Sequence, residues 1–390
     1  MSLETASYVR TEMVDTLPPP RSSTGLLGWM RKNLFASISD TVLTLLGVLI
    51  VLWAAPQLYG FLIGNAVWVA ENGEACRVAG TGACWAYIWD RADFFVYGFY
   101  PIDKRFADWP GVWSTLLGYW RINLVFLVGL VLLIPLLTPK VPFKVANALL
   151  FFIPFPVFVF FMLTGGVFGL EAVPTEKWGG LTITLIIGLV GIITSLPLGI
   201  LLALGRQSKL PIIRIASVMF IELWRSVPLI TVLFMASIML PLFAPEGVTV
   251  DKLLRALIGV ALFNSAYMAE VVRGGLQAMP RGQYEAASAL GLNYWKRMIL
   301  IILPQALKYV IPGIVNTFIS LFKDTSLVSI VGIFDLLKTV QSSTADLNWT
   351  SPTQAITGYV FCAAVFWVFC FSMSRYSRSM ERRLETGHKR

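Results

Sequence analysis

The sequence predicts an all-α polytopic membrane protein with about eight transmembrane helices. Of its 390 residues, 56% are hydrophobic and 14% charged, and the mean hydropathy is +0.72, well above what a single water-soluble core requires. Apolar stretches of about 20 residues, the length that crosses a bilayer, recur from Thr41 to Tyr376. The net charge of +9 comes from basic residues in connections and tails beside these stretches, which indicates retention on the cytoplasmic side rather than nucleic-acid binding.

The first three predicted spans form an N-terminal transmembrane extension, residues 38–180. They cover about residues 38–60, 114–137 and 148–164. Residues 1–37 precede them as a cytoplasmic tail, whose polar leader is expected to be disordered and contains three consecutive prolines. The loop of about residues 64–113 is rich in Trp and Tyr, and we expect it in the periplasm, lying against the lipid headgroups.

The last five predicted spans form a core, residues 181–380, which a basic cytoplasmic tail follows at residues 381–390. The fourth span, residues 181–209, carries Gly, Ser and Thr at close intervals, which allow tight helix contacts. The next apolar stretch is too long for one straight helix, so Pro228 is expected to break it before the chain emerges near Pro245. The remaining spans start at about residues 253, 306 and 356. An even number of spans places both termini in the cytoplasm.

The four cysteines fall into two pairs with different predicted roles. Cys362 and Cys370 lie in the last span, where a helix would separate them by about 12 Å along its axis, too far for a disulfide. Cys76 and Cys84 bracket a Gly-rich part of the loop after the first span. If that loop is periplasmic a disulfide between them is chemically allowed, and two free thiols are the equal alternative.

A polar, helix-prone segment interrupts the apolar core at residues 274–300, which the span order places in the cytoplasm. It contains GQYEAASALGLNYWKR, and Pro280 favours a helix from Gln283 to Lys296. The alanines share one small face, which lets another protein approach the backbone closely. A helix on the membrane surface is the alternative, although this face would bury little apolar area there. The residues expected to meet a partner are Gly282, Glu285, Ala286, Ala287, Leu290 and Gly291.

The segment EAASALG, followed by ILPQAL, resembles the EAA loop of permease subunits of ABC importers. TITL and WRSVPLI upstream are similar to the polar amino-acid branch of that family, and the resemblance covers residues 181–380. It implies a five-helix permease core whose EAA loop is the coupling helix, seated in a cleft of an ATPase subunit. The long form, with three spans before the core, resembles the M-type permease of general L-amino acid importers and its relative serving glutamate, glutamine, aspartate and asparagine.

The same resemblance implies a bacterial inner-membrane assembly. Its members are a second homologous permease subunit, two ATPase subunits that use ATP and Mg, and a periplasmic amino-acid-binding protein. The role of the three-span extension is not implied by the resemblance.

The residues themselves argue against enzyme activity in this chain. It has no G-x-x-x-x-G-K-[ST] phosphate-binding loop, so nucleotide chemistry would belong to a partner. The single histidine, His388, is near the C-terminus, and no Cys/His/carboxylate cluster has metal-ligand spacing. We therefore expect no enzyme activity, metal or cofactor in the chain. Two other classes remain as alternatives: an ion-coupled secondary transporter, which commonly shows internal repeats, and a non-transporting membrane anchor.

Polar residues inside the predicted spans are candidates for a substrate pathway, because a charge at the bilayer centre costs about 2.5–3.5 kcal/mol. Asn264, Tyr267 and Glu270 recur every third residue and therefore share one face of the sixth span. Glu270 could accept a substrate ammonium, but its position near the helix end favours a pair with Arg273.

Further candidates lie in the seventh span and before the break at Pro228. Asn316, Lys323 and Asp324 belong to the seventh span, where the adjacent Lys323 and Asp324 project about 100° apart. Each then needs another partner, either on another helix, which we favour and which could belong to a second permease subunit, or in a substrate or gate. Glu222 and Arg225 are three residues apart and are expected to neutralise each other, with contact to the substrate as the alternative.

Overall fold

The computed structural model describes residues 25–109, 111–138, 141–167, 169–243, 245 and 249–384. Within these ranges the chain is helical and forms no strand beyond two isolated bridges. The predicted leader, most of the basic tail and His388 lie outside the described residues. The chain divides into two compact units, residues 1–66 with 80–83 and residues 67–79 with 84–390.

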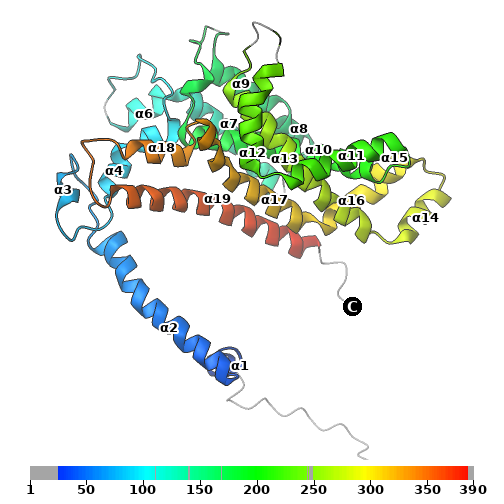
Figure 1. The fold of residues 1–390 in the computed structure, drawn as a ribbon, viewed down its shortest axis with the longest axis horizontal. Coiled ribbons are helices and arrows are strands. Elements are labelled where there is room, and N and C mark those ends of the chain that lie inside the picture. The colour runs from blue at the N-terminus through cyan, green and yellow to red at the C-terminus, as the bar shows by residue number, and fades with distance from the viewer. Residues whose placement is uncertain are drawn as a thin grey trace, which may run out of the picture. The chain divides into compact units, whose positions relative to one another are not determined.

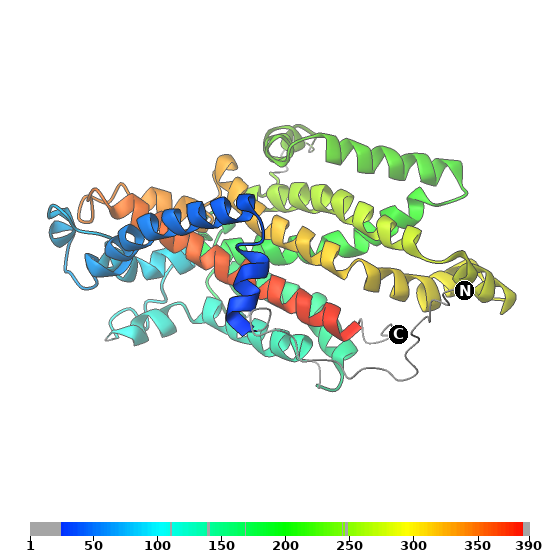
Figure 2. The same ribbon diagram turned by 90° about the horizontal axis from the view of Figure 1, so that it is seen from below.

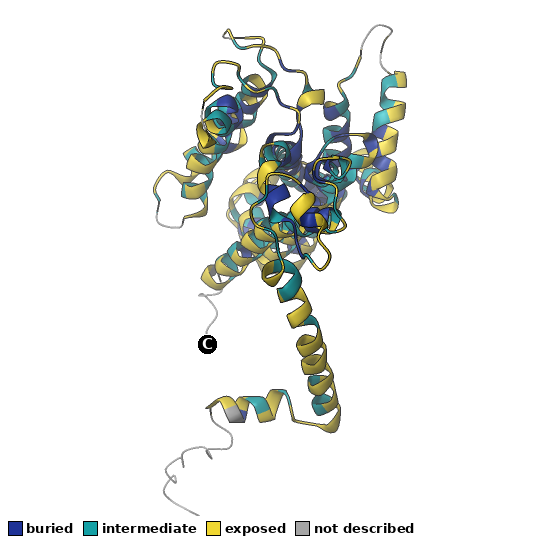
Figure 3. Ribbon diagram, turned by 90° about the vertical axis from the view of Figure 1, so that its left-hand side faces the viewer, coloured by how far each residue is buried: buried dark blue, intermediate teal, exposed yellow. Residues whose placement is uncertain are grey.

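The first unit contains α1 (Gly25–Asn33), α2 (Ile38–Tyr59) and a π-helical turn at Gly60–Gly64. Ser37 begins α2 by accepting the Asp40 backbone N–H, as an N-cap residue does. Together they make a span, Ile38–Gly64, close to the one predicted. No residue of α2 is buried within the chain, and Figure 3 shows the helix exposed along its length. Its apolar side chains suit the hydrocarbon of a bilayer.

The second unit holds the remaining membrane helices. In the described part of the chain, seven helices are long and apolar enough to cross a bilayer, or eight with one bent pair. The spans of this unit are Trp120–Leu137 (α7), Lys144–Thr164 (α8 and α9), Gly180–Arg206 (α10), Lys252–Ala278 (α13), Ile311–Val331 (α17 and a 3-10 turn) and Gln354–Arg383 (within α19). The bent pair is Pro211–Ser226 (α11) with Leu229–Phe243 (α12 and two short turns).

Prolines set the breaks in these spans. The two halves of the bent pair meet at 105°, with Pro228 extended at the start of α12, which confirms the predicted break. Pro154 likewise separates α8 (Lys144–Phe152) from α9 (Pro154–Thr164). Pro312 lies in the first turn of α17 (Ile311–Asp324), so the predicted seventh span divides into that helix and α16 (Leu303–Tyr309).

The small residues predicted to allow tight contact do so along α10. A Cβ added at Gly199 would lie 2.7 Å from the Met268 side chain of α13, and one at Gly191 would lie 2.8 Å from Leu321 of α17. Helices α10 and α13 therefore pack almost backbone to backbone, and α19 runs along α17 (Figures 1 and 2).

The loop between the first two spans is folded rather than spread over a membrane surface. Its helices are α3 (Glu74–Arg77), α4 (Trp85–Asp90), α5 (Ala92–Tyr97) and α6 (Val112–Gly118). Tyr87, Phe95, Tyr97 and Tyr100 are buried, so the expectation that the loop's aromatics lie against headgroups is wrong for these residues, which pack in the protein core instead. Cys76 and Cys84 are joined by a disulfide, and both are buried.

Residues 67–79 and 84–100, which we call the cap, dock on α18 (Leu336–Ser343) and the chain that follows it. The Trp349 indole N–H donates to Asp90 at 2.8 Å, and Arg77 Nε donates to the Thr350 carbonyl at 2.7 Å. Tyr87 hydrogen-bonds with Ser343. Helix α18 was not predicted. The cap and the loop that carries α14 (Arg281–Ala289) lie at opposite ends of this unit (Figure 1).

Candidate functional site

A groove between α13 and α17 brings together four of the predicted pathway residues. Its volume is about 490 Å³. On α13 it is lined by Asn264 and Tyr267, and on α17 by Asn316 and Asp324. The remaining lining residues are Phe263, Val271, Gly313, Thr317 and Ser320. Two amides, two hydroxyls, a phenol and a carboxylate therefore face one space that is otherwise apolar.

The groove keeps hydrogen-bonding capacity free. The buried Asn264 donates through Nδ2 to the Val260 carbonyl at 2.9 Å, which leaves the amide oxygen to accept. Thr317 donates back to the Gly313 carbonyl at 2.9 Å. Among the described residues, no ion pair or hydrogen bond engages the half-buried Asp324 carboxylate.

Two predicted pathway residues do not line the groove. Lys323 is exposed and is not among the lining residues of the groove, and no ion pair within the described ranges engages it. Within the described part of this chain, no ion pair joins Lys323 or Asp324 to a neighbouring helix, so their pairing with a helix of a second permease subunit stays a prediction. Glu270 lies in a charged cluster at the end of the sixth span instead.

Glu270 forms ion pairs with three arginines from three helices. Its Oε1 lies 2.8 Å from Arg206 of α10, and its Oε2 lies 2.8 Å from Arg273 of α13. Arg225 of α11 is 3.8 Å away. The predicted pair of Glu270 with Arg273 thus exists, but it is one contact of a larger cluster that ties α10, α11 and α13 together.

The expected pair of Glu222 with Arg225 is wrong. Glu222 accepts instead from Arg206 at 2.9 Å, and the Arg225 guanidinium lies 5.7 Å from the centre of the Tyr267 ring. Spacing within one helix suggested the pair, whereas Arg206 reaches in from α10, a partner that sequence spacing cannot reveal. With three arginines and two glutamates, the cluster has an excess positive charge beside a wall residue of the groove.

The segment after α13 folds as two short helices instead of the one predicted from Gln283 to Lys296. α14 ends at Ala289, and α15 (Tyr294–Arg297) begins after Asn293, whose side chain accepts the Lys296 N–H. Gly291 lies between them with φ +71°, the left-handed conformation that favours glycine and ends a helix.

The exposure of this segment divides the predicted contact residues. Gly282, Glu285, Ala286 and Gly291 are exposed, and Leu290 exposes 75% of its surface. Ala287 exposes only 1%, so the expectation that it meets a partner is wrong, because that side of α14 packs on the chain itself. Gly282, Ala286 and Leu290 are four residues apart and form an exposed row of small side chains that ends on a leucine.

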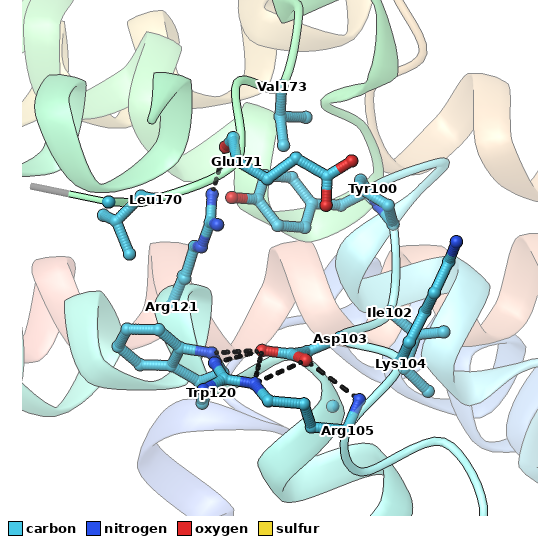
Figure 4. Close-up of a pocket in the computed structure, with 13 residues that line it drawn as sticks. Tyr100, Ile102, Asp103, Lys104, Arg105, Trp120, Arg121, Leu170, Glu171 and Val173 are labelled. Carbon is cyan, nitrogen blue, oxygen red and sulfur yellow. Dashed lines mark hydrogen bonds and ion pairs between the residues drawn. The ribbon is translucent and has the colours of Figure 1, made fainter. Parts of the chain in front are cut away.

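A charged pocket in the extension was missed by the sequence analysis. Figure 4 shows it between the start of α7 and the loop near Glu171, and its volume is about 310 Å³. Asp103 accepts from Arg105 and from the Trp120 indole at 3.1 Å, and the Arg105 contact holds the pKa of Asp103 below its usual range. Arg121 donates to the Glu171 carbonyl at 2.7 Å. The adjacent charges at residues 103–105 were the available signal.

Comparison with known proteins decides the family. The model of the "binding-protein-dependent transport system inner membrane component" matches residues 195–386. The inner membrane amino-acid ABC transporter permease protein YhdY of Escherichia coli is 52% identical over 95% of this chain and 96% of its own length. The chain belongs to the amino-acid ABC transporter permeases.

Two further comparisons describe how far the likeness extends. The glutamate/glutamine/aspartate/asparagine transport system permease protein BztC of Rhodobacter capsulatus is 42% identical over 98% of this permease and 99% of its own length. A chain in the crystal structure of an amino acid ABC transporter with histidines is 29% identical, covering 52% of the permease and 92% of that chain with a TM-score of 0.46. YhdY and BztC therefore match through the extension as well as the core.

Family membership confirms the reading of the sequence as a permease subunit of an ABC importer. The loop of residues 274–300 is the EAA loop typical of this family, and Ala287 is the one buried residue of its helix α14.

Proposed function

We propose that this permease carries amino acids across the bacterial inner membrane as one half of a heterodimer with a second, similar permease. Two ATPase subunits, which bind ATP and Mg, would drive it, and a periplasmic binding protein would deliver the substrate. The observation that carries this proposal is the exposed row Gly282, Ala286 and Leu290 in a family whose members work within ABC transporters. This chain has no phosphate-binding loop of its own.

Both termini lie in the cytoplasm in this proposal, with α14 and α15 on the same side. The cap then lies in the periplasm, an oxidising compartment in which the Cys76–Cys84 disulfide persists. The location of the cap and α14 at opposite ends of the second unit supports this orientation (Figure 1).

The substrate moves along the groove between α13 and α17. An α-amino acid carries an ammonium and a carboxylate, and Asp324 offers the groove's one carboxylate to the ammonium. Amide and hydroxyl groups, such as those of Asn264 and Asn316, suit the polar remainder of the substrate. The relatives' names make acidic amino acids and their amides candidate substrates, beside a broader set.

Coupling follows from the connection between the groove and α14. Helix α13 ends at Ala278 and α14 begins at Arg281, so a displacement of α14 by a closing ATPase dimer acts directly on the end of α13. Glu270 joins this end of α13 to α10 and to the arm of α11 before the Pro228 bend. The three helices therefore respond together, and the groove opens alternately to the two sides.

Reconstitution in liposomes tests this function. The permease is co-purified with its partner permease and ATPase and placed in liposomes. We expect uptake of labelled glutamate or glutamine only when ATP is present on the side of the membrane that the ATPase faces and the binding protein is present on the other side. A variant ATPase without hydrolysis serves as the control. Uptake by the permease alone, driven by an ion gradient, would contradict the proposal.

A further inference from the structure

Two cavities share a wall where the extension meets the core. The larger, about 400 Å³, lies between α9, α10 and α13 and is lined mainly by apolar side chains such as Val159, Phe160, Val190 and Leu257. The smaller, about 250 Å³, is lined by Glu176, Lys252 and the chain near Phe334, among other residues. Thr175, Trp178 and Leu253 line both.

The larger cavity has the depth of one membrane leaflet. Along α10 it reaches Val190, ten residues or about 15 Å from the first residue of the helix. Along α9 it reaches from Thr164 back to Pro156, about 12 Å. The hydrocarbon core of a bilayer is about 30 Å thick, so the cavity extends from one face to about the middle.

The polar groups of the larger cavity are all at its outer end. Thr164 is the last residue of α9, and Thr175, Trp178 and Asp251 lie outside the spans. Thr175 donates to Asp251, which also accepts the Leu254 N–H at 2.9 Å. The space is therefore polar at the membrane surface and apolar below it, which is the profile of a lipid.

Trp178 lines both cavities and carries a buried donor. The residue exposes 4% of its surface, and its indole N–H has no hydrogen-bond partner among the described residues. Burying a donor without an acceptor is unfavourable, so a bound acceptor is expected. Lys252, beside it in the smaller cavity, uses one of its three donors on the Gly332 carbonyl at 3.1 Å and keeps two.

We propose that a phospholipid binds where the two cavities meet, with one acyl chain in the larger cavity. Its ester or phosphate oxygens accept from the Trp178 indole and from Lys252, whose positive charge complements the phosphate. The site borders hydrocarbon, since the lining residues Phe160 and Leu254 are themselves exposed on membrane helices, so lipid is the most abundant candidate occupant. The bound lipid fills the contact between extension and core.

Three substitutions separate the parts of this proposal. Val190→Trp fills the apolar cavity, and Trp178→Phe removes the indole N–H while keeping an aromatic ring. Leu201→Phe is the matched control, because Leu201 lies on the same helix, faces outward and lines neither cavity.

The full permease, purified from membranes and exchanged extensively into detergent, is examined by native mass spectrometry with lipid extraction. We expect about one phospholipid retained per chain in the wild type and in Leu201→Phe, at least ten-fold less in Val190→Trp, and several-fold less in Trp178→Phe. Equal retention in wild type and Val190→Trp would overturn the proposal, as would wild-type protein that carries detergent only.

A second measurement does not depend on how Val190→Trp folds. Wild-type permease is placed in nanodiscs of phosphatidylethanolamine and phosphatidylglycerol that contain a phospholipid with a photoreactive acyl chain. Adducts concentrated in residues 156–164 and 186–190 are expected. Adducts spread evenly over the lipid-facing helices, or adducts formed equally by a free fatty acid, would contradict a site that recognises the headgroup end.

Discussion

The Glu270 carboxylate on α13 lies 2.8 Å from the Arg206 guanidinium at the end of α10. Arg206 also bonds Glu222 of α11 at 2.9 Å, so one arginine and one glutamate are the central members of a five-residue cluster. The side chain of Glu270 is 17% exposed and that of Glu222 is 55% exposed. Solvent therefore screens the second contact more than the first.

Replacing Glu270 by Gln should destabilise the permease and impair transport, because three arginines would lose their shared negative charge. Hydrogen bonds to charged groups contribute about 1.5–3 kcal/mol each, and we expect a loss of about 2 kcal/mol in the free energy of unfolding. Glu222→Gln is the control and should cost under about 1 kcal/mol. Thermal unfolding of both variants measures the difference. Equal melting temperatures of Glu270→Gln and Glu222→Gln would show that Glu270 does not hold the three helices together.

Bulk on the exposed row of residues 282, 286 and 290 should prevent the ATPase from docking and so abolish ATP-driven transport. A side chain at Gly282 would extend into open space, and its backbone has no positive φ, so Gly282→Trp adds volume without strain. We expect Gly282→Trp to abolish ATP-driven uptake while membrane insertion stays normal, and Gly282→Ala to transport near the wild-type rate. Gly291 is a poorer site for this test, because its φ of +71° strains any side chain.

Uptake and co-purified ATPase are measured together for the Gly282 pair. Loss of ATPase from the Gly282→Trp complex is the expected cause of the defect. Normal uptake by Gly282→Trp would show that this row does not contact the ATPase.

Local features of the sequence predicted much of the fold, and long-range contacts account for what was missed. The lengths of the apolar stretches predicted the spans, and Pro228 predicted the break in the bent pair. Both are local signals, because each depends on residues that are adjacent in the sequence. The same sequence predicted a pair of Glu222 with Arg225 and no partner for Arg206. The observed pair joins Glu222 of α11 to Arg206 of α10, and spacing within one helix does not reveal a contact between two helices. The groove could be anticipated in part, since the polar residues of α13 recur every third position.

The cap and the orientation of α14 show the same limit. Trp349 and Asp90 are 259 residues apart in the sequence, and no pattern of either segment indicates that they pair. Ala287 and Ala286 are equivalent in helix propensity and size, yet only Ala286 is exposed. The side that a short helix buries is decided by the helices beside it.

Reduction of the Cys76–Cys84 disulfide should destabilise the cap. The bond closes a short loop, eight residues in sequence separation, and the entropy of such a loop corresponds to about 2–3 kcal/mol. We expect Cys76→Ser with Cys84→Ser to increase amide hydrogen exchange in the cap and in residues 336–350. Cys370→Ser is the control, since this cysteine is free and lies in α19. Unchanged exchange in the double variant would indicate that α18 holds the cap without the disulfide.

Asp324 and its neighbour Lys323 form a matched pair for testing the groove. Asp324 lines the groove and Lys323 does not. Asp324→Asn keeps the shape but removes the negative charge offered to a substrate ammonium, so we expect ATP-driven uptake to fall at least ten-fold. Lys323→Gln should change uptake less than two-fold. The same loss in both variants would point to a general structural role for this turn of α17 rather than to contact with the substrate.

Asp335 should give the fold a pH dependence that Asp335→Asn removes. The residue is fully buried outside the spans, at the start of α18, and its carboxylate accepts the Leu337 and Lys338 N–H groups at 3.1 and 3.0 Å. Burial raises its pKa to about 6, above the value of 3.8 expected in the unfolded chain. The folded state therefore prefers the protonated form. Its stabilising contribution is complete below about pH 4 and is lost as the pH rises through 6.

The size of this effect is roughly 3 kcal/mol at most, since each pKa unit corresponds to about 1.4 kcal/mol. We expect the wild-type melting temperature to rise when the pH is lowered from 7.5 to 5, with slower amide exchange in residues 336–343. An asparagine is neutral at every pH and keeps an oxygen that can accept the N–H groups, so Asp335→Asn should lose most of this dependence and be at least as stable at pH 7.5. The same pH dependence in both proteins would assign the effect to another group.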